Sequence, residues 1–231
     1  ISLTSICWKL MKHVIKGQLL EFLKHNDLIS EHQPGILAKH STCTQLIECV
    51  NDWTLALNFR NSVDVAYLDF SKAFDSVSHS KLILKLQSFG IGGKLLDWVN
   101  NYLSGRSQAV KVGNCLSKVY RVGSGVLQGS VLGPLLFLLY INDIADELSD
   151  FLKEKLFADD AKIYIVIDDI NKCAVLQDGL DKLFEWSVKW QLNLAKDKCH
   201  ILHIGKVIGN FNYIILTILR CHSVNKLLIY E

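Results

Sequence analysis

Three aspartates are the residues of this sequence whose type and spacing best suit a chemical step. Asp69 follows the mostly apolar run 63–68, and Asp159 and Asp160 stand side by side about 90 residues later, between two strand-like runs. Carboxylates that converge repel one another unless cations lie between them. Oxygen ligands of this kind suit Mg²⁺, and two such ions stabilise the attacking and leaving oxygens of a phosphoryl displacement. A simpler interpretation stays open, because Asp-Asp is a common turn dipeptide and an Asp at a strand end often caps a helix.

The elements that would position these aspartates predict an α+β fold with an antiparallel sheet. Residues 63–69 have the pattern of a buried strand, and residues 152–157 and 162–167 that of a tight hairpin with the two neighbouring aspartates at its tip. Adjacent antiparallel strands would bring all three carboxylates to one edge of the sheet. The other predicted elements are helices over residues 4–25, 42–59, 78–89, 94–103, 131–148 and 172–190, a hairpin over residues 106–122 and a strand over residues 199–204.

Composition bounds the chain only loosely. With 231 residues, half of them apolar, it is long enough for one large domain or two small lobes. The net charge of +2 argues neither for nor against nucleic-acid binding. No acidic residue lies between Asp97 and Asp143, a stretch that we expect to present a basic face to a phosphate backbone or to form an ordinary solvated hairpin. Its basic residues are Arg106, Lys111, Lys118 and Arg121.

The cysteines and the apolar runs point to an intracellular protein with no membrane partner. The seven cysteines are scattered without the spacing of a zinc site or a disulfide framework. The longest apolar run, 131–141, is interrupted by Gly133 and Pro134 and is too short to span a bilayer. The chain starts on Ile1 and stops inside an apolar stretch, which is typical of a piece of a longer protein.

Three longer strings give the aspartates a context. Residues 66–77 read A-Y-L-D-F-S-K-A-F-D-S-V, residues 125–144 read G-V-L-Q-G-S-V-L-G-P-L-L-F-L-L-Y-I-N-D-I, and residues 156–164 read L-F-A-D-D-A-K-I-Y. Their order and spacing closely resemble the reverse transcriptases of LINE-type, non-LTR retrotransposons. Shorter matching strings extend the resemblance over about residues 1–205.

This resemblance implies the core of an RNA-directed DNA polymerase. Its cofactor would be Mg²⁺, with Mn²⁺ as a substitute, and its partners an RNA template, a DNA primer and deoxynucleoside triphosphates. The implied fold is a right hand without a thumb, with fingers mainly in residues 1–62 and a palm built on an antiparallel sheet mainly in residues 63–205, which also contain inserted fingers elements. Residues 206–231 form a divergent tail, eroded or frameshifted. A parent polyprotein would supply thumb and endonuclease parts, and the family acts in the nucleus.

Site residues follow from the resemblance position by position. Asp69 and Asp159 would hold the metal together with the backbone carbonyl of Phe70, and Asp160 would support them as the third catalytic carboxylate. The residues implied to bind the nucleotide are Ser71, Lys72, Phe74, Gln128, Gly129, Lys39 and Lys198.

Three of the implied nucleotide contacts also have simpler interpretations. The resemblance implies that Phe74 excludes a 2′-hydroxyl by bulk, that Gln128 contacts the nucleotide or the template, and that Lys198 gives charge or a proton to the leaving pyrophosphate. Without the resemblance, Phe74 is an ordinary core aromatic, Gln128 belongs to a surface turn and Lys198 is a solvated lysine.

The chain departs from the family pattern at a few positions. Leu37 stands where relatives carry a triphosphate-gripping arginine, and Lys39 can replace it only as a point charge. Leu127 stands where proline is usual, and Ala161 where threonine is usual. These departures favour a second hypothesis, a catalytically silent retrotransposon remnant with at most weak nucleic-acid binding. A maturase- or telomerase-like relative is a third, which the strings match less well.

Overall fold

The structure, a computed structural model, describes residues 6–29, 42–157, 159–206, 211, 213 and 214. The chain forms two compact units, each assembled from segments that lie far apart in the sequence. The first unit consists of Ile1–Ile29, Lys72–Ile141 and Trp190–Leu192. The second unit consists of Ser30–Ser71, Asn142–Lys189 and Asn193–Glu231.

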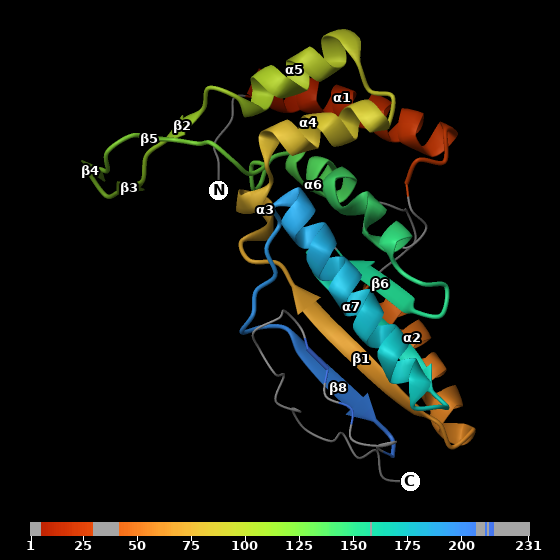
Figure 1. Cartoon of the computed structure of the whole chain (residues 1–231). Helices are drawn as coiled ribbons and strands as arrows, with labels where there is room; N and C mark the ends of the chain where they lie inside the picture. The colour runs from red at the N-terminus through yellow and green to blue at the C-terminus, as the bar shows by residue number, and fades with distance from the viewer. Residues whose placement is uncertain (1–5, 30–41, 158, 207–210, 212, 215–231) are drawn as a thin grey trace. The chain divides into compact units, whose positions relative to one another are not determined.

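The second unit is built on a four-stranded antiparallel sheet with the strand order β6-β7-β1-β8. The strands are β1 (Ser62–Asp69), β6 (Lys153–Phe157), β7 (Asp160–Ile167) and β8 (His200–Ile204). Strand β1 lies beside β8 (Figure 1), pairs with β7 on its other side and is buried along most of its length. Its β-branched and aromatic residues suit a strand that is covered on both faces. The antiparallel sheet expected from the sequence is therefore confirmed.

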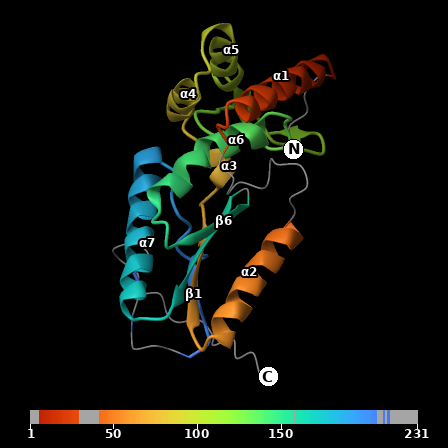
Figure 2. The same ribbon diagram turned by 90° about the vertical axis from the view of Figure 1, so that its right-hand side faces the viewer.

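Two helices cover opposite faces of this sheet, α2 (Thr42–Asn58) on one side and α7 (Asn171–Trp190) on the other (Figure 2). Cys49 of α2 packs with Val65 and Tyr164 in one buried cluster. Helix α7 has its own buried stripe, with Cys173, Leu176, Leu180 and Leu183 among its buried residues. Because side chains alternate between the two faces of a strand, a slip of one residue would move every side chain that faces α2 to the side of α7, and the reverse. Burial on both faces therefore fixes the strand register.

A buried carboxylate of β1 has hydrogen-bond partners on both of its oxygens. Asp64 of β1 is 5% exposed and accepts hydrogen bonds from Nδ1 of His203, at 2.6 Å, and from the hydroxyl of Tyr213. The bond to Asp64 raises the pKa of His203 above its usual range, against the opposing effect of burial. A buried charge with these partners is tolerated in a core that would otherwise exclude it.

The first unit is mainly helical. Its helices are α1 (Ile6–His25), α3 (Ala73–Ser76), α4 (His79–Ser88), α5 (Gly93–Leu103) and α6 (Gly133–Ile141). Helix α6 is buried on almost every side, as its uniformly apolar sequence requires. Lys85 of α4 is only 3% exposed, yet it donates to the carbonyl of Tyr140 and lies 3.9 Å from the ring centroid of Trp190. These contacts compensate its buried charge.

The basic hairpin of this unit matches the expected element, although its strands are short. Its four strands have two residues each: β2 (Ser107–Gln108), β3 (Lys111–Val112), β4 (Cys115–Leu116) and β5 (Tyr120–Arg121). Strand β2 pairs with β5 and β3 pairs with β4, so the chain turns back around Gly113 and Asn114. All residues of these strands are exposed, so no packing against a core supports longer strands.

Most of the predicted helices are confirmed, but two expectations are wrong in detail. The helix expected over 131–148 is α-helical only to Ile141 and continues as a 3₁₀ helix, η1 (Asn142–Glu147). Asp143 in η1 accepts a 3.0 Å hydrogen bond from Nε1 of Trp186, which favours the tighter turn. Asp160 belongs to β7 and not to the hairpin tip, because it is paired within the sheet.

None of the helices in the described part of the chain combines the length and the apolar character that a bilayer span requires.

Gly125 tests the packing of the glycine-rich loop against the α3 segment. It has a φ of +89°, and an added Cβ would lie 2.8 Å from backbone atoms of Asp75. We expect Gly125→Ala to lower the free energy of unfolding by about 2 kcal/mol, since it combines backbone strain with a clash against main chain. Urea denaturation measures this loss. Gly123→Ala is the matched control, because nothing lies within 4 Å of its added Cβ. Equal losses in both variants would contradict the packing described.

Candidate active site

Asp69 and Asp160 face each other across two strands of the sheet in the second unit. The register of β1 and β7 pairs them directly, and Asp160 is also paired with Phe157 of β6. Side chains of directly paired residues lie on the same face of a sheet. Asp159 occupies the turn that precedes β7. The long-range pairing of β1 with β7 therefore places the first and last of the three predicted catalytic carboxylates side by side.

Lys198 neutralises Asp69. Its Nζ lies 3.2 Å from both carboxylate oxygens of Asp69, and its side chain is 65% exposed. Main-chain bonds hold the segment that carries it, since the Ala195 amide donates to the Asp69 carbonyl at 2.7 Å. The Ser71 amide donates to the Asn193 carbonyl at 2.8 Å. The lysine is thus held at the end of β1 by backbone pairing.

The carboxylates act on one another electrostatically. Partial desolvation raises the pKa of the Asp160 carboxyl above its ordinary value of 3.8, and the charges of Asp159 and Asp69 raise it further. Lys198 and Lys162 oppose this shift. A carboxyl whose pKa is raised by like charges favours the approach of a cation.

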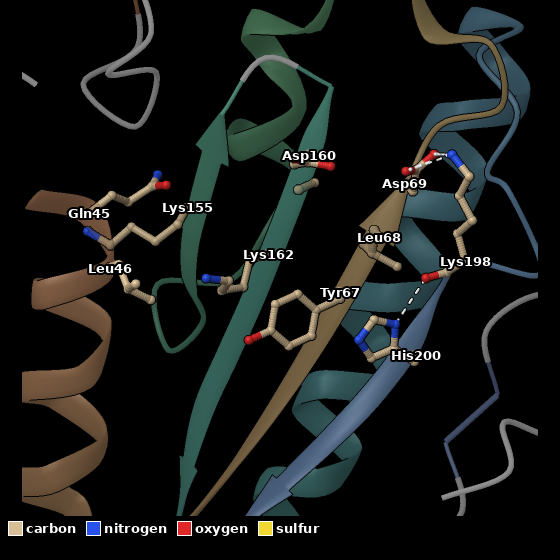
Figure 3. A pocket seen from close by; sticks show the side chains of 11 residues that line it. Gln45, Leu46, Tyr67, Leu68, Asp69, Lys155, Asp160, Lys162, Lys198 and His200 are labelled. Atoms are coloured by element: carbon tan, nitrogen blue, oxygen red, sulfur yellow. Dashed lines mark hydrogen bonds and ion pairs between the residues drawn. The ribbon is translucent and has the colours of Figure 1, made fainter. Parts of the chain in front are cut away.

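A pocket of about 410 Å³ opens on the face of the sheet that carries this pair (Figure 3). Its walls come from α2, from β1, β6, β7 and β8, and from the segment before β8. The lining residues are Gln45, Leu46, Tyr67, Leu68, Asp69, Lys155, Asp160, Ala161, Lys162, Lys198 and His200. A cavity of this size with a few converging polar groups is typical of a small-ligand or substrate site.

The fit of a metal ion depends on this donor set. Among the residues that the structure describes, no group of three or more His, Cys, Asp or Glu side chains is arranged to hold a metal. The donors at the end of β1 are nevertheless the hard oxygens that Mg²⁺ prefers, and the ammonium of Lys198 already lies at Asp69 as a cation. Phe70 is 3% exposed and its ring centroid lies 6.2 Å from that of Trp186, so it takes part mainly in packing here.

Most of the predicted nucleotide-binding residues belong to the first unit, not to the unit with the aspartates. Phe74 stacks on Phe137 with ring centroids 4.4 Å apart, and Nε2 of Gln128 donates to Oδ1 of Asp75 at 3.3 Å. Gly129 has a φ of +76°, with open space where a Cβ would lie. The positive φ at this position therefore favours glycine. Lys72 precedes α3 as an exposed residue in the left-handed conformation.

The Gly-rich loop and the α3 segment form one block within the first unit. The Val126 amide donates to the Phe74 carbonyl and the Gly125 amide to the Val77 carbonyl, both at 2.8 Å. Ser124 Oγ donates to the Asp75 carbonyl at 2.9 Å. Two strings that are about 50 residues apart in sequence are thereby joined. Sequence reasoning missed Asp75 as the partner of Gln128, although it lies inside the matching string 66–77.

The remaining predicted residues are placed as follows. Ser71 is exposed and follows β1 by two positions. Lys39 and the departure at Leu37 lie outside the described residues. In the hairpin, Lys111, Lys118 and Arg121 are exposed. Arg106 is half-buried instead, because its guanidinium donates to the Tyr102 carbonyl at 3.3 Å.

Three pocket residues next to the aspartates were also missed. Tyr67, Lys162 and His200 line the pocket, and each is two positions along the chain from Asp69, Asp160 or Lys198. Period-two alternation of a strand was the signal that could have found Tyr67, because it places Tyr67 on the face of Asp69.

Comparison with known proteins assigns the chain to a family. The family described as reverse transcriptase (RNA-dependent DNA polymerase) matches residues 1–225. The chain belongs to this family. It is a reverse transcriptase domain of the LINE type, as the motifs predicted.

The relatives in question are retrotransposon proteins of flies. The probable RNA-directed DNA polymerase from transposon X-element of Drosophila melanogaster is 31% identical over 202 residues, which are 86% of this chain. The RNA-directed DNA polymerase from mobile element jockey of Drosophila funebris is 30% identical over 201 residues, or 83% of this chain. In each case the match spans 22% of the relative's length.

Solved structures show the same fold at much lower identity. Apo telomerase from Candida tropicalis truncated from its C-terminal domain has a TM-score of 0.60 and 14% identity, over 88% of this chain and 42% of that chain. Telomerase from Candida albicans in complex with a fragment of telomeric RNA has a TM-score of 0.58 and 15% identity, over 85% of this chain and 34% of that chain.

Asp160→Asn tests the repulsion between the carboxylates. Because the pKa of Asp160 is raised on folding, ionisation costs the folded state stability as pH rises from 3.8 through the folded-state value. We therefore expect Asp160→Asn to increase the free energy of unfolding at pH 7, by an amount that shrinks as pH falls toward 3.8. Urea titrations in metal-free buffer at several pH values measure this. The exposed Asp150, replaced by Asn, serves as the control, and an unchanged or lower stability of Asp160→Asn at pH 7 would refute the repulsion.

Proposed function

We propose that this chain is the RNA-directed DNA polymerase core of a non-LTR retrotransposon, which transfers nucleotides to a primer 3′-hydroxyl. The observation that carries the proposal is the direct pairing of Asp69 with Asp160 beside an open pocket, in a member of the reverse transcriptase family. Fingers mainly from residues 1–62 and a palm mainly from residues 63–205 make up the proposed right hand, and residues 206–231 are its divergent tail.

The proposed cofactor is Mg²⁺, with Mn²⁺ as a substitute. Asp69 and Asp159 would hold it with the carbonyl of Phe70, and Asp160 would support the site with its charge. When bound, the ions supply charge stabilisation for the attacking and leaving oxygens of the transfer. The carboxylates of this chain position that charge at the end of β1, and the exposed ammonium of Lys198 is free to leave Asp69 for the pyrophosphate.

The proposed nucleotide contacts are those that the resemblance implies. Ser71, Lys72 and Lys39 would bind the triphosphate, Gln128 would contact the incoming nucleotide or the template, and Gly129 would let the backbone approach closely. Phe74 would exclude a ribose by its bulk. Its stacking on Phe137 favours this role, because the neighbouring ring restricts its rotation.

The proposed partners are an RNA template, a DNA primer and deoxynucleoside triphosphates. Exposed Lys111, Lys118 and Arg121 would contact the phosphate backbone together with Arg106. Because the chain spans about a fifth of the length of the relatives it matches, thumb and endonuclease parts of a parent polyprotein complete the cycle in this proposal. The proposed location is the nucleus, where such elements insert.

Primer extension tests this function directly. On a poly(A) RNA template with an oligo(dT) primer, we expect the chain to incorporate dTTP in Mg²⁺ or Mn²⁺. Asp159→Ala should lower the rate by about 100-fold or more, because a metal ligand is lost. Asp178→Asn on α7 is the control, since Asp178 is exposed and pairs with Lys182 one helical turn away. If the folded chain extends no primer in either metal, the catalytically silent remnant, which Leu37 favours, replaces the polymerase.

Phe74→Val tests sugar selection. A smaller side chain should admit the 2′-hydroxyl, so we expect the ratio of ribonucleotide to deoxynucleotide incorporation to rise by about tenfold to 100-fold. Single-nucleotide extension with UTP and dTTP measures this ratio. Phe137→Leu is the control for altered packing, because Phe137 is fully buried behind Phe74. A ratio that changes equally in both variants would contradict the role of Phe74.

A further inference from the structure

A second row of side chains crosses the sheet next to the carboxylates. The strand registers pair Tyr67 with Lys162 on one side and with His200 on the other. This row lies two residues along β1 from Asp69, on the same face, at a distance of about 6.8 Å along the strand. Figure 3 shows the ring of Tyr67 between Lys162 and His200, with Asp69 and Asp160 above them. All three residues line the same pocket as the carboxylates.

The members of this row hold one another in place. The rings of Tyr67 and His200 are stacked with centroids 4.8 Å apart and an angle of 11° between their planes. On the other side, Nζ of Lys162 lies 5.1 Å from the centroid of Tyr67 and 5.7 Å from that of Trp53. Such cation–π contacts orient an ammonium group without neutralising its charge.

Within the described part of the chain, one cation of this row has no carboxylate partner in a salt bridge. The other pocket lysines are paired, Lys155 with Glu48 at 2.7 Å and Lys198 with Asp69 at 3.2 Å. Lys162 makes no salt bridge to any residue in the described ranges, although its charge acts on Asp160, and its Nζ lies over the rings of Tyr67 and Trp53. It therefore retains a full positive charge for an external anion.

His200 adds a second polar atom. Its Nδ1 lies 3.0 Å from the carbonyl oxygen of Lys198. A carbonyl only accepts hydrogen bonds, so Nδ1 carries the proton and Nε2 is the ring nitrogen that remains for a ligand. The same bond ties the row to the segment that carries Lys198, and hence to the carboxylates.

Only this one row of side chains lies between the carboxylates and α2. The next residues on this face, Val65 and Tyr164, are buried in the cluster with Cys49 of α2. A ligand that starts at Asp69 and Asp160 therefore meets the open row of Lys162, Tyr67 and His200 and then reaches the wall formed by α2. The row is therefore the part of the pocket that lies between the carboxylates and α2.

We propose that this row is a subsite for the primer strand, in which Lys162 binds the phosphodiester between the last two nucleotides of the primer and His200 contacts the adjoining sugar. Tyr67 is a positioning residue that holds both. The inference rests on the proposed polymerase function, because the primer is the strand whose 3′ end lies at the carboxylates. The template strand lies across the duplex, so its phosphates are farther from this row.

Salt dependence of binding provides the first test. The probe is a labelled DNA primer annealed to an RNA template, and fluorescence anisotropy in EDTA gives its dissociation constant between 50 and 200 mM salt. Each phosphate contact contributes about 0.9 to the slope of log affinity against log salt. We expect Lys162→Met to lose about one phosphate contact. Between the two salt concentrations, the fold loss of affinity should therefore be roughly threefold smaller for Lys162→Met than for the wild type. Lys182→Met on α7 should leave the slope unchanged.

Uncharged linkages in the primer identify the phosphate that Lys162 contacts. A methylphosphonate placed in turn at each of the first four linkages from the primer 3′ end removes one charge at a known position. The wild type should lose about threefold or more in affinity when the last linkage is neutral, and Lys162→Met should show no further loss there. Sensitivity that remains in Lys162→Met, or that follows linkages of the template strand, overturns the proposal.

The two assays separate this inference from the polymerase function. If Lys162→Met changes the slope and the methylphosphonate effect while no primer is extended, the subsite stands and the polymerase function fails. If the wild type extends primers and Lys162→Met binds them with an unchanged slope, only the subsite fails. His200→Phe, which keeps the stack on Tyr67 but loses Nε2, should weaken primer binding without changing the salt slope, and an unchanged affinity would remove His200 from the subsite.

Discussion

The pairing of β1 with β7 is the constraint on which the rest of the structure depends. It places two carboxylates directly opposite each other, an arrangement that costs stability when both are charged. The sheet maintains it because β1 is covered on both faces, by α2 and by α7, so that no shift of register preserves the core. Burial along β1 thus keeps the two carboxylates paired although they repel each other.

The surroundings of the pair compensate its charge only in part. Lys198 reaches Asp69 from a segment that the backbone of residues 69–71 holds, and it is largely exposed. An ion pair with an exposed lysine contributes little to stability, so another cation readily replaces the ammonium group. The same face continues into Lys162, Tyr67 and His200, so that a negative end and a positive row share one pocket. This alternation of charge suits a ligand that carries both phosphates and metal ions.

Much of this arrangement could be predicted from the sequence, for reasons that differ between elements. The strand over 63–69 and the helix over 172–190 have strong apolar patterns, and both exist in the structure. The one-turn helix α3 is too short for such a pattern, and the 3₁₀ continuation after Ile141 depends on the tertiary bond between Asp143 and Trp186. Lys162 and His200 escaped notice because only the register of three strands brings them to Tyr67.

In the proposed site, the carboxylates at the end of β1 bind a divalent cation that displaces Lys198. A Mn²⁺ titration followed by electron paramagnetic resonance measures free ions and tests the claim without any polymerase activity. Our account predicts that the wild type removes Mn²⁺ from solution, that Asp69→Asn abolishes this binding, and that Lys198→Met strengthens it because the competing ammonium is gone. Binding that is absent from the folded wild type, or equal in the wild type and Asp69→Asn, would contradict the account.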